Sequence, residues 1–250
     1  MPFQPHNDLV DIPDDTVLWR YVDLYRLLDL LQTSELHLTR VDQMEDRWEG
    51  AYSSVNVAQR PTIYGDAWPK MSAAFPQMYM YTRTHTYVNC WYVGSEESYA
   101  MWRLYDAAGK GVAIKTNATR LKAALQGSLL ILGSKVQYVD YNKTYIPEGN
   151  VLFPYIHKRR SFAHESEYRL INLWSPKALE VDENKVATRT EPDAPPPFLR
   201  ESVNLGTLIE ATYVSPDAPG WAARVVEDAV QKYLPDSEVR QSDLGADPVA

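Results

Sequence analysis

The order of hydrophobic and polar residues changes between two periods along the chain, and each change predicts the start of a new element. Residues 17–21 (VLWRY) have the apolar, extended character of a strand, whereas residues 23–33 (DLYRLLDLLQT) place leucines on one side of a helix. Residues 36–39 return to the two-residue alternation of a strand. Asp23 is the expected N-cap of the helix, because its carboxylate can accept a backbone N–H. The chain is therefore predicted to open as strand–helix–strand.

The same patterns predict the elements of the rest of the chain. Further strands are expected over residues 87–93, 111–115, 129–141 (one or two strands), 170–173, 208–214 and 238–242. Further helices are expected after a Ser95 cap as far as Gly109, after Thr116 or Asn117 as far as Leu125, over residues 152–160 and over residues 218–233. No internal repeat is visible, so we predict one α+β domain over residues 1–250, with its core at about 17–243. Its sheet is expected to be mixed, mainly antiparallel and split, with flanking helices.

Three segments lack a clear pattern. Residues 41–50 (VDQMEDRWEG) form an acidic loop, which suits either a functional lip or a solvated connection. Residues 51–85 contain prolines, aromatic residues and a weak helical pattern around 67–80, and suit either a packed insertion or a lid. Residues 175–200 are polar and proline-rich, and a strand–helix–strand pattern follows them, so they are predicted to form a long loop inside the domain.

Composition limits the classes of function. The net charge of −8 and the pI near 5.2 disfavour broad coating of nucleic acid, which depends on clustered Lys and Arg. One cysteine, Cys90, permits no internal disulfide and no zinc site built on several thiolates, so a reducing cytoplasm is expected. The five histidines show no close metal-ligand spacing, and no metal is expected. The N-terminal residues have no signal-peptide pattern, and no apolar run approaches the roughly 20 residues of a membrane span.

The densest polar chemistry lies in residues 158–174 (KRRSFAHESEYRLINLW), directly before and within a predicted core strand. Glu165 and Glu167 are two residues apart, so on an extended segment both point to one face. One interpretation is that these carboxylates form ion pairs with nearby arginines. The other is that they perform chemistry. Arg20, within the first strand, similarly either points outward or needs a carboxylate or phosphate partner.

These residues also carry a resemblance to a known family. The chain resembles the DUF2971 family of small bacterial proteins of unknown function over roughly residues 17–243. The similar segments are LWRY in the first strand, Glu-Gly at residues 49–50, SEESYAMWRLYDAAGKGVAIK at residues 95–115, HESEYRLI, and VSPDAP with the helix after it. The sequence departs from the family pattern at His164, where the family often has an aromatic residue, and in residues 175–200, which form a long insertion.

More distantly, the chain is similar to the ADP-ribosyltransferase superfamily. That superfamily uses an arginine or histidine on the first strand to hold NAD, a Ser or Tyr on a middle strand, and a late glutamate that drives transfer. The resemblance implies that Arg20 contacts the phosphates or ribose of NAD and that Tyr92 or Ser95 is the middle element. It further implies that Glu167 is the catalytic glutamate, with Glu165 assisting.

The chemistry of NAD cleavage asks for the same residue types. A carboxylate stabilises the positive charge that develops on the ribose when the nicotinamide bond breaks. The guanidinium of Arg20 or Arg169 suits the pyrophosphate, and an aromatic ring such as Tyr21 suits the nicotinamide. We therefore expect an NAD-consuming ADP-ribosyltransferase-like enzyme or NAD glycohydrolase, and a toxin-type effector of bacterial defence is one form that such an enzyme takes. NAD would be its substrate, and a macromolecule of unknown identity its acceptor.

Two other functions stay open at this point. A non-enzymatic module would bind a nucleotide or a protein through an aromatic and arginine-lined face. A metal-dependent nuclease would use the carboxylates of the acidic loop, which are Asp42, Glu45, Asp46 and Glu49. The enzyme hypothesis requires that Arg20, the strand end at residues 92–95 and Glu167 converge on one cleft.

Overall fold

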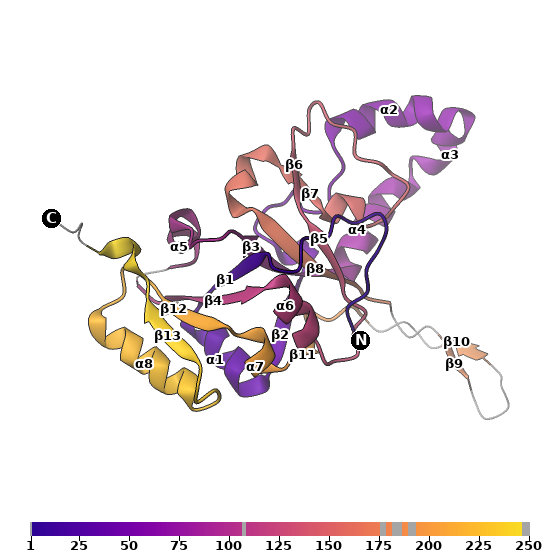
Figure 1. Cartoon of the computed structure of the whole chain (residues 1–250). Coiled ribbons are helices and arrows are strands. Elements are labelled where there is room, and N and C mark those ends of the chain that lie inside the picture. Colours follow the sequence, from indigo (N-terminus) through magenta and orange to yellow (C-terminus); the bar gives the residue numbers. More distant parts are fainter. Residues whose placement is uncertain (1, 107–108, 176–178, 182–186, 190–193, 247–250) are drawn as a thin grey trace.

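A nine-stranded sheet runs through the molecule, with helices packed on it (Figure 1). The computed structural model describes residues 2–106, 109–175, 179–181, 187–189 and 194–246. The strand order is β11-β2-β3-β1-β4-β12-β13, while β8 pairs with β3 and β5 pairs with β8. The strands are β1 (Val17–Asp23), β2 (Glu35–Arg40), β3 (Thr86–Val93), β4 (Gly111–Asn117), β5 (Leu132–Lys135), β8 (Glu167–Leu173), β11 (Phe198–Ser202), β12 (Ala211–Val214) and β13 (Glu238–Gln241). β12 and β13 run parallel, and the other pairs of this described sheet are antiparallel. The predicted α+β domain with a mixed, mainly antiparallel sheet is confirmed.

Strand β3 has two different neighbours along one of its edges. One edge of β3 is occupied by β8, which pairs with it from Thr86 to Tyr92. On the opposite edge, β2 pairs with β3 at Val88 and β1 pairs with it at Tyr92. Between these two points a side chain takes the place of the backbone pairing: the side-chain amide of Asn89 donates to the carbonyl of His37 in β2 at 2.9 Å. The sheet therefore opens between β1 and β2, and this opening shapes the candidate site.

The helices that pack on the sheet are short. They are α1 (Leu24–Thr33), α5 (Tyr99–Tyr105), α6 (Ala118–Ala124), α7 (Leu205–Leu208) and α8 (Gly220–Gln231). Asp23 caps α1 as predicted, by accepting from the backbone N–H of Arg26 at 2.8 Å. Leu27, Leu30 and Leu31 of α1 are buried against one face of the sheet together with Leu18 and Ile114, whereas Leu28 is exposed. Trp19 and Tyr21 point to the opposite face, where they pack on α5.

A helical arm precedes β3. It consists of α2 (Ser54–Tyr64), α3 (Trp68–Met71) and α4 (Ala74–His85), and Figure 1 shows it extending away from the sheet, with α4 leading back to it. The predicted helical pieces around 67–80 are thus confirmed. Within the described residues of these three helices, the buried side chains are those of Asn56 and Arg60, and both are polar. The buried side chains of the arm are therefore polar, and its aromatic side chains are at most partly buried.

The predicted helix over residues 152–160 is wrong. The chain instead forms a 3-10 turn at Phe153–Tyr155, the strand β7 (His157–Arg159) and a 3-10 helix, η4 (Arg160–Glu165). β7 pairs in parallel with β6 (Gln137–Val139), so its backbone hydrogen bonds go to another segment. Pairing with a distant strand outweighs the local helical pattern here.

The long loop predicted over residues 175–200 is also wrong in the part that is described. β9 (Leu179–Val181) and β10 (Ala187–Arg189) form a two-stranded sheet, and β11 pairs with β2. The remaining residues of the segment between 176 and 193 lie outside the described residues. The predicted strand over 208–214 is shorter than expected, because Asn204 caps the short helix α7 by accepting from Thr207 N–H at 2.8 Å.

Candidate functional site

A cavity of about 850 Å³ opens on the sheet face that carries Trp19 and Tyr21. Its walls come from β1, β3, β8, the acidic loop over residues 41–50, α5 and η4. Among the residues predicted from the sequence, the cavity is lined by Arg20, Tyr21, Tyr92, Glu165 and Glu167. It thus brings together segments from both halves of the chain.

Strand register places the polar residues of β3 and β8 side by side. Tyr92 lies opposite Glu167, and Cys90 lies opposite Arg169. Residues paired in this way point to the same face, so all four side chains stand on one side of the sheet. Tyr92 also lies opposite Trp19 of β1. Glu167 thus stands on this face of the sheet, but Glu165 ends the 3-10 helix η4 and Ser166 between them has a left-handed backbone, so the extended segment expected over the two glutamates is wrong.

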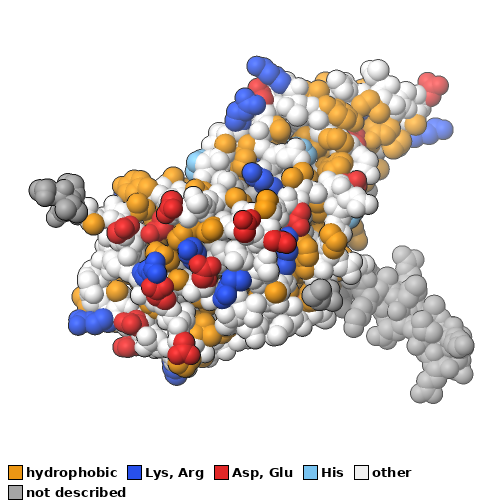
Figure 2. All heavy atoms as spheres, viewed as in Figure 1, with side chains coloured by type: hydrophobic (Ala, Val, Ile, Leu, Met, Phe, Trp, Pro, Cys, Tyr) orange, Lys and Arg blue, Asp and Glu red, His pale blue; other side chains and the backbone are white. Residues whose placement is uncertain are grey.

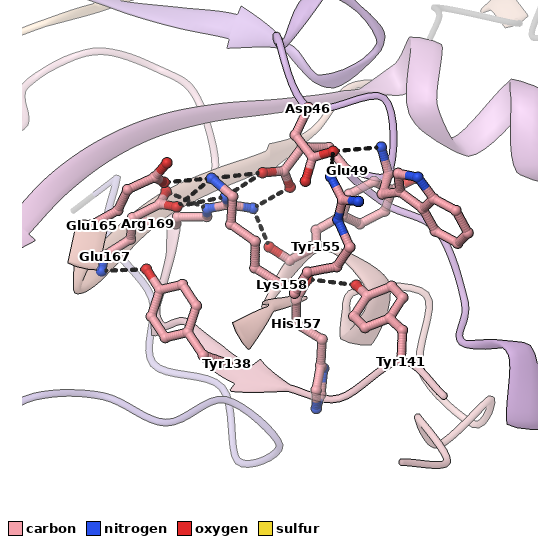
Figure 3. A network of polar contacts seen from close by, with 12 residues as sticks. Asp46, Glu49, Tyr138, Tyr141, Tyr155, His157, Lys158, Glu165, Glu167 and Arg169 are labelled. Carbon is pink, nitrogen blue, oxygen red and sulfur yellow. Dashed lines mark hydrogen bonds and ion pairs between the residues drawn. The ribbon is translucent and has the colours of Figure 1, made fainter. Parts of the chain in front are cut away.

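Arg169 is the buried centre of an ion network (Figure 3). Its guanidinium donates to both oxygens of Glu49 at 2.8 Å and to both oxygens of Glu167 at 2.8 and 3.0 Å. A fifth bond goes to the carbonyl of Tyr155 at 2.9 Å. All five N–H groups of the guanidinium are thus used. Arg169 was predicted to bind pyrophosphate, but its side chain is fully buried and does not line the cavity.

Lys158 joins the network from β7. Its ammonium contacts Glu167 at 2.9 Å and Glu49 at 3.2 Å, and it also donates to Glu165. Burial alone would lower the pKa of Lys158, but the carboxylates of Glu167 and Glu49 outweigh it and raise that pKa. Lys158 therefore stays charged while it is buried.

The network holds three carboxyl groups against two cations, so one carboxyl group lacks a full counter-charge. Burial and the neighbouring Glu167 carboxylate raise the pKa of Glu165 to about 7. Burial also acts on Glu167, but Arg169 and Lys158 hold its pKa well below the usual value. Glu165 is therefore the member of the network that exchanges a proton near neutral pH.

The side chains of the two glutamates that were predicted to be catalytic consequently differ in their exposure to solvent. The side chain of Glu167 is 5% exposed, and both of its oxygens are bound by cations. The side chain of Glu165 is 18% exposed, and it lies at the rim of the network where η4 ends. The ion-pair interpretation is confirmed for Glu167, which binds Arg169, and Glu165 pairs with Lys158 instead of an arginine, while the catalytic interpretation stays a prediction.

Arg20 lies in the opening between β1 and β2. Alternation along β1 turns it away from Trp19 and Tyr21, yet it lines the cavity because the sheet is open at this point. Its guanidinium donates to the carbonyl of Cys90 at 3.2 Å and lies 5.7 Å from the ring centre of Trp91. Burial lowers the pKa of Arg20 to about 10. Arg20 forms no ion pair within the described part of the chain.

Other unpaired guanidinium groups line the same cavity. Like Arg20, Arg26 and Arg47 line it without an ion pair to any described residue. Arg26 lies in the first turn of α1, and Arg47 belongs to the acidic loop. Guanidinium groups without an ion pair can bind an anionic ligand. The carboxylates of Asp23 and Glu45 line the same cavity, also without a cationic partner among the described residues, and they oppose such a ligand.

Of the three remaining residues predicted to bind NAD, two tyrosines line the cavity and one serine does not. Tyr21 accepts from the backbone N–H of Ser98 at 2.7 Å and packs edge-on to Trp102, so it is a fixed part of the wall. Tyr92 lies 6.2 Å from Tyr21 between ring centres. Ser95 is exposed and does not line the cavity, and Ser98 rather than Ser95 caps α5 by accepting from Met101 N–H. The proposed role of Ser95 in either place is therefore not supported by its position.

Several residues of the site were not assigned to an NAD site from the sequence. Glu49 and Lys158 complete the network, and Tyr105 of α5 lines the cavity within electrostatic reach of both Arg20 and the two glutamates. Burial raises the pKa of Tyr105 to about 12. Glu49 and Lys158 are conspicuous charges in the sequence, but their pairing depends on distant segments.

Three of the four carboxylates of the acidic loop already have cationic partners, and Glu45 has none among the described residues. Asp42 binds Arg40 at 2.7 Å, Asp46 binds Arg159 at 2.7 Å, and Glu49 binds Arg169. No set of three or more His, Cys, Asp or Glu placed to hold a metal occurs among the described residues. The arrangement thus gives the nuclease hypothesis no supporting observation.

Comparison with known proteins gave no match to any family model, to any curated protein or to any solved structure. The resemblances to DUF2971 and to ADP-ribosyltransferases stay predictions. In the described part of the chain, no helix combines the length and the hydrophobicity that a bilayer crossing requires.

Proposed function

We propose that the protein binds NAD in the 850 Å³ cavity and cleaves the bond between nicotinamide and ribose. The observation that supports this best is the composition of one cavity, in which unpaired arginines accompany a carboxyl group with a pKa near neutrality. Guanidinium groups suit a pyrophosphate, and a carboxyl group beside the ribose suits a transition state with positive charge on the sugar. The aromatic wall offers surface for flat rings.

The two glutamates take different roles in this proposal. When the bond breaks, its electron pair stays on the nicotinamide nitrogen and the ribose becomes positively charged. Ionised Glu165 stabilises that charge, and it then accepts the proton of the water or acceptor group that attacks the ribose. Glu167 is a positioning residue, because Arg169 fixes it and it holds Lys158, which in turn binds Glu165.

Nicotinamide release tests the proposal. Purified protein is incubated with NAD, alone and with cell extract, and free nicotinamide is followed over time. We expect Glu165→Gln to lower the rate by about 10²-fold or more, the range of general acid–base catalysis. The control is Glu96→Gln, which alters an exposed glutamate outside the cavity. Release that depends on extract would indicate that an acceptor is required, as the toxin-type hypothesis predicts.

A non-enzymatic nucleotide-binding module is the second candidate, and one observation favours it. Glu167, the glutamate that the superfamily resemblance makes catalytic, is fully engaged by Arg169 and Lys158. A purely structural network would leave the cavity able to bind but not to cleave. This alternative predicts saturable binding of NAD and ADP-ribose with no nicotinamide release, and no effect of Glu165→Gln on the ligand's chemical fate.

A further inference from the structure

A second cavity, of about 560 Å³, lies along the helical arm and is lined mainly by aromatic and apolar side chains. Trp68, Phe75 and Tyr79 come from α3 and α4, and Tyr52 comes from the segment before α2. The ring centres of Trp68 and Phe75 are 5.4 Å apart. This volume falls within the range of about 300–1,000 Å³ that is common for small-molecule sites.

A buried arginine holds the rings of this cavity in place. The guanidinium carbon of Arg60 lies 4.2 Å from the ring centre of Phe75 and 5.2 Å from that of Tyr52. Glu148 accepts from Arg60 at 2.9 Å and from the hydroxyl group of Tyr64 at 2.7 Å. The charge of Arg60 is thus neutralised within the protein, and its planar group serves as a fixed support for the rings.

The arm leaves its apolar side chains available to a ligand. Helices are normally stabilised by burying an apolar face, but no apolar side chain of α2, α3 or α4 is buried among the described residues. Figure 2 shows hydrophobic side chains gathered over this part of the molecule. Val57 and Met78, which line the cavity, are 56% and 47% exposed. A flat apolar ligand in the cavity would cover these groups.

The charge of the lining selects the kind of ligand. No aspartate or glutamate is found among the described lining residues, although the chain as a whole is acidic. Arg47 is exposed at the edge of the cavity, without an ion pair to any described residue. A guanidinium group in this position attracts an anionic substituent.

We propose that the second cavity is a binding site for a small planar aromatic anion, whose ring packs against Trp68 and Phe75 and whose charge faces Arg47. Arg47 and Trp48 line both cavities, so the two ligands would lie on either side of the acidic loop. This site does not depend on the proposed NAD chemistry.

Calorimetric titration with naphthalene-2-sulfonate tests the site. We expect one molecule to bind per chain, and naphthalene-2-sulfonamide, which has the same ring without the charge, to bind about tenfold more weakly. Cyclohexanesulfonate, which has the charge without the planar ring, should bind at least about fivefold more weakly. Absence of binding at millimolar concentration, or equal binding of the three compounds, would overturn the proposal.

Three variants localise the binding. Arg47→Ala should weaken naphthalene-2-sulfonate about tenfold while leaving the sulfonamide unchanged, and its exposed position keeps the fold intact. Trp68→Ala should weaken both naphthalene compounds, with circular dichroism confirming that it folds. Trp221→Ala, on the distant helix α8 with a side chain 60% exposed, should bind like wild type. Because Arg47 lines both cavities, unchanged affinity in folded Trp68→Ala would by itself contradict the site, whatever the effect of Arg47→Ala.

Discussion

Arg169 and Glu49, 120 residues apart in the sequence, form a doubly hydrogen-bonded ion pair in which both side chains are completely buried. This pair ties the acidic loop to the central strand β8, and Glu167 shares the same guanidinium. The geometry of the candidate site therefore depends on an ion pair between Glu49, which lines the cavity, and Arg169, which does not reach it. Removing this ion pair should lower the free energy of unfolding, whereas removing a group that faces a ligand should lower the affinity for that ligand.

Arg169→Met should destabilise the fold strongly. Removing one partner leaves Glu49 and Glu167 buried without a full counter-charge, a loss of about 3–5 kcal/mol in the free energy of unfolding. Arg103→Ala is the matched control, because its ion pair with Asp217 is more than half exposed and contributes less than about 1 kcal/mol. Urea unfolding measures both values. Similar small losses in the two variants would contradict the buried network.

Arg20→Met should behave in the opposite way. Arg20 has no carboxylate partner among the described residues, so removing its partly buried charge should leave the free energy of unfolding unchanged or slightly higher. The affinity for ADP-ribose should fall about tenfold or more, because a charged hydrogen bond to phosphate is lost. Calorimetry and urea unfolding provide the two readouts. An unfolded variant would show that Arg20 is structural. A folded variant with wild-type affinity would show that Arg20 does not contact the ligand.

The stability contributed by Glu165 should depend on pH. Its pKa is about 7 in the folded protein, above the ordinary value of 4.5, so the folded state binds this proton more tightly than the unfolded chain. That contribution is complete below pH 4.5 and is lost as the pH rises through 7. Glu165→Gln, which cannot ionise, should therefore gain on the order of 1–3 kcal/mol relative to wild type between pH 5 and pH 8. A stability difference that is constant over this range would contradict the assignment.

Glu148→Ala should loosen the helical arm and leave the sheet intact. Glu148 accepts from Asn56, Arg60 and Tyr64, which attaches α2 to the rest of the chain. Hydrogen exchange should accelerate over residues 54–85 by about tenfold or more, because buried polar groups lose their partner. Asp66→Asn, on the exposed turn after α2, is the control. Equal acceleration in β3 and β8 would show that the arm and the sheet unfold together.

Much of the fold can be predicted from local patterns. Residues 17–21 and 87–93 are extended and apolar, and they become central strands. Residues 152–160 have a helical pattern, but β7 pairs with β6, and this pairing between segments decides the outcome. β11 follows a run of three prolines and gains its strand structure from β2, which the sequence nearby does not reveal.

The sequence also predicts the candidate site only in part, because some of its residues are recognised by local spacing and others by contacts with distant segments. Glu165 and Glu167 can be found from their spacing, and Arg20 from its place within a strand. Glu49 cannot be assigned to Arg169 from the sequence, since an ion pair over 120 residues leaves no local signal. Ser95 and Ser98 both precede the same helix, and only the structure distinguishes the serine that caps it. Side chains that act through distant partners thus need the fold to be recognised.

Nicotinamide release by wild type and by Glu165→Gln at neutral pH is the measurement that tests the proposed function most directly. Wild type is expected to release nicotinamide, and a folded Glu165→Gln variant is expected to do so at a rate about 10²-fold lower. No release by folded wild type with or without cell extract, or equal rates in the two proteins, would contradict the proposed function.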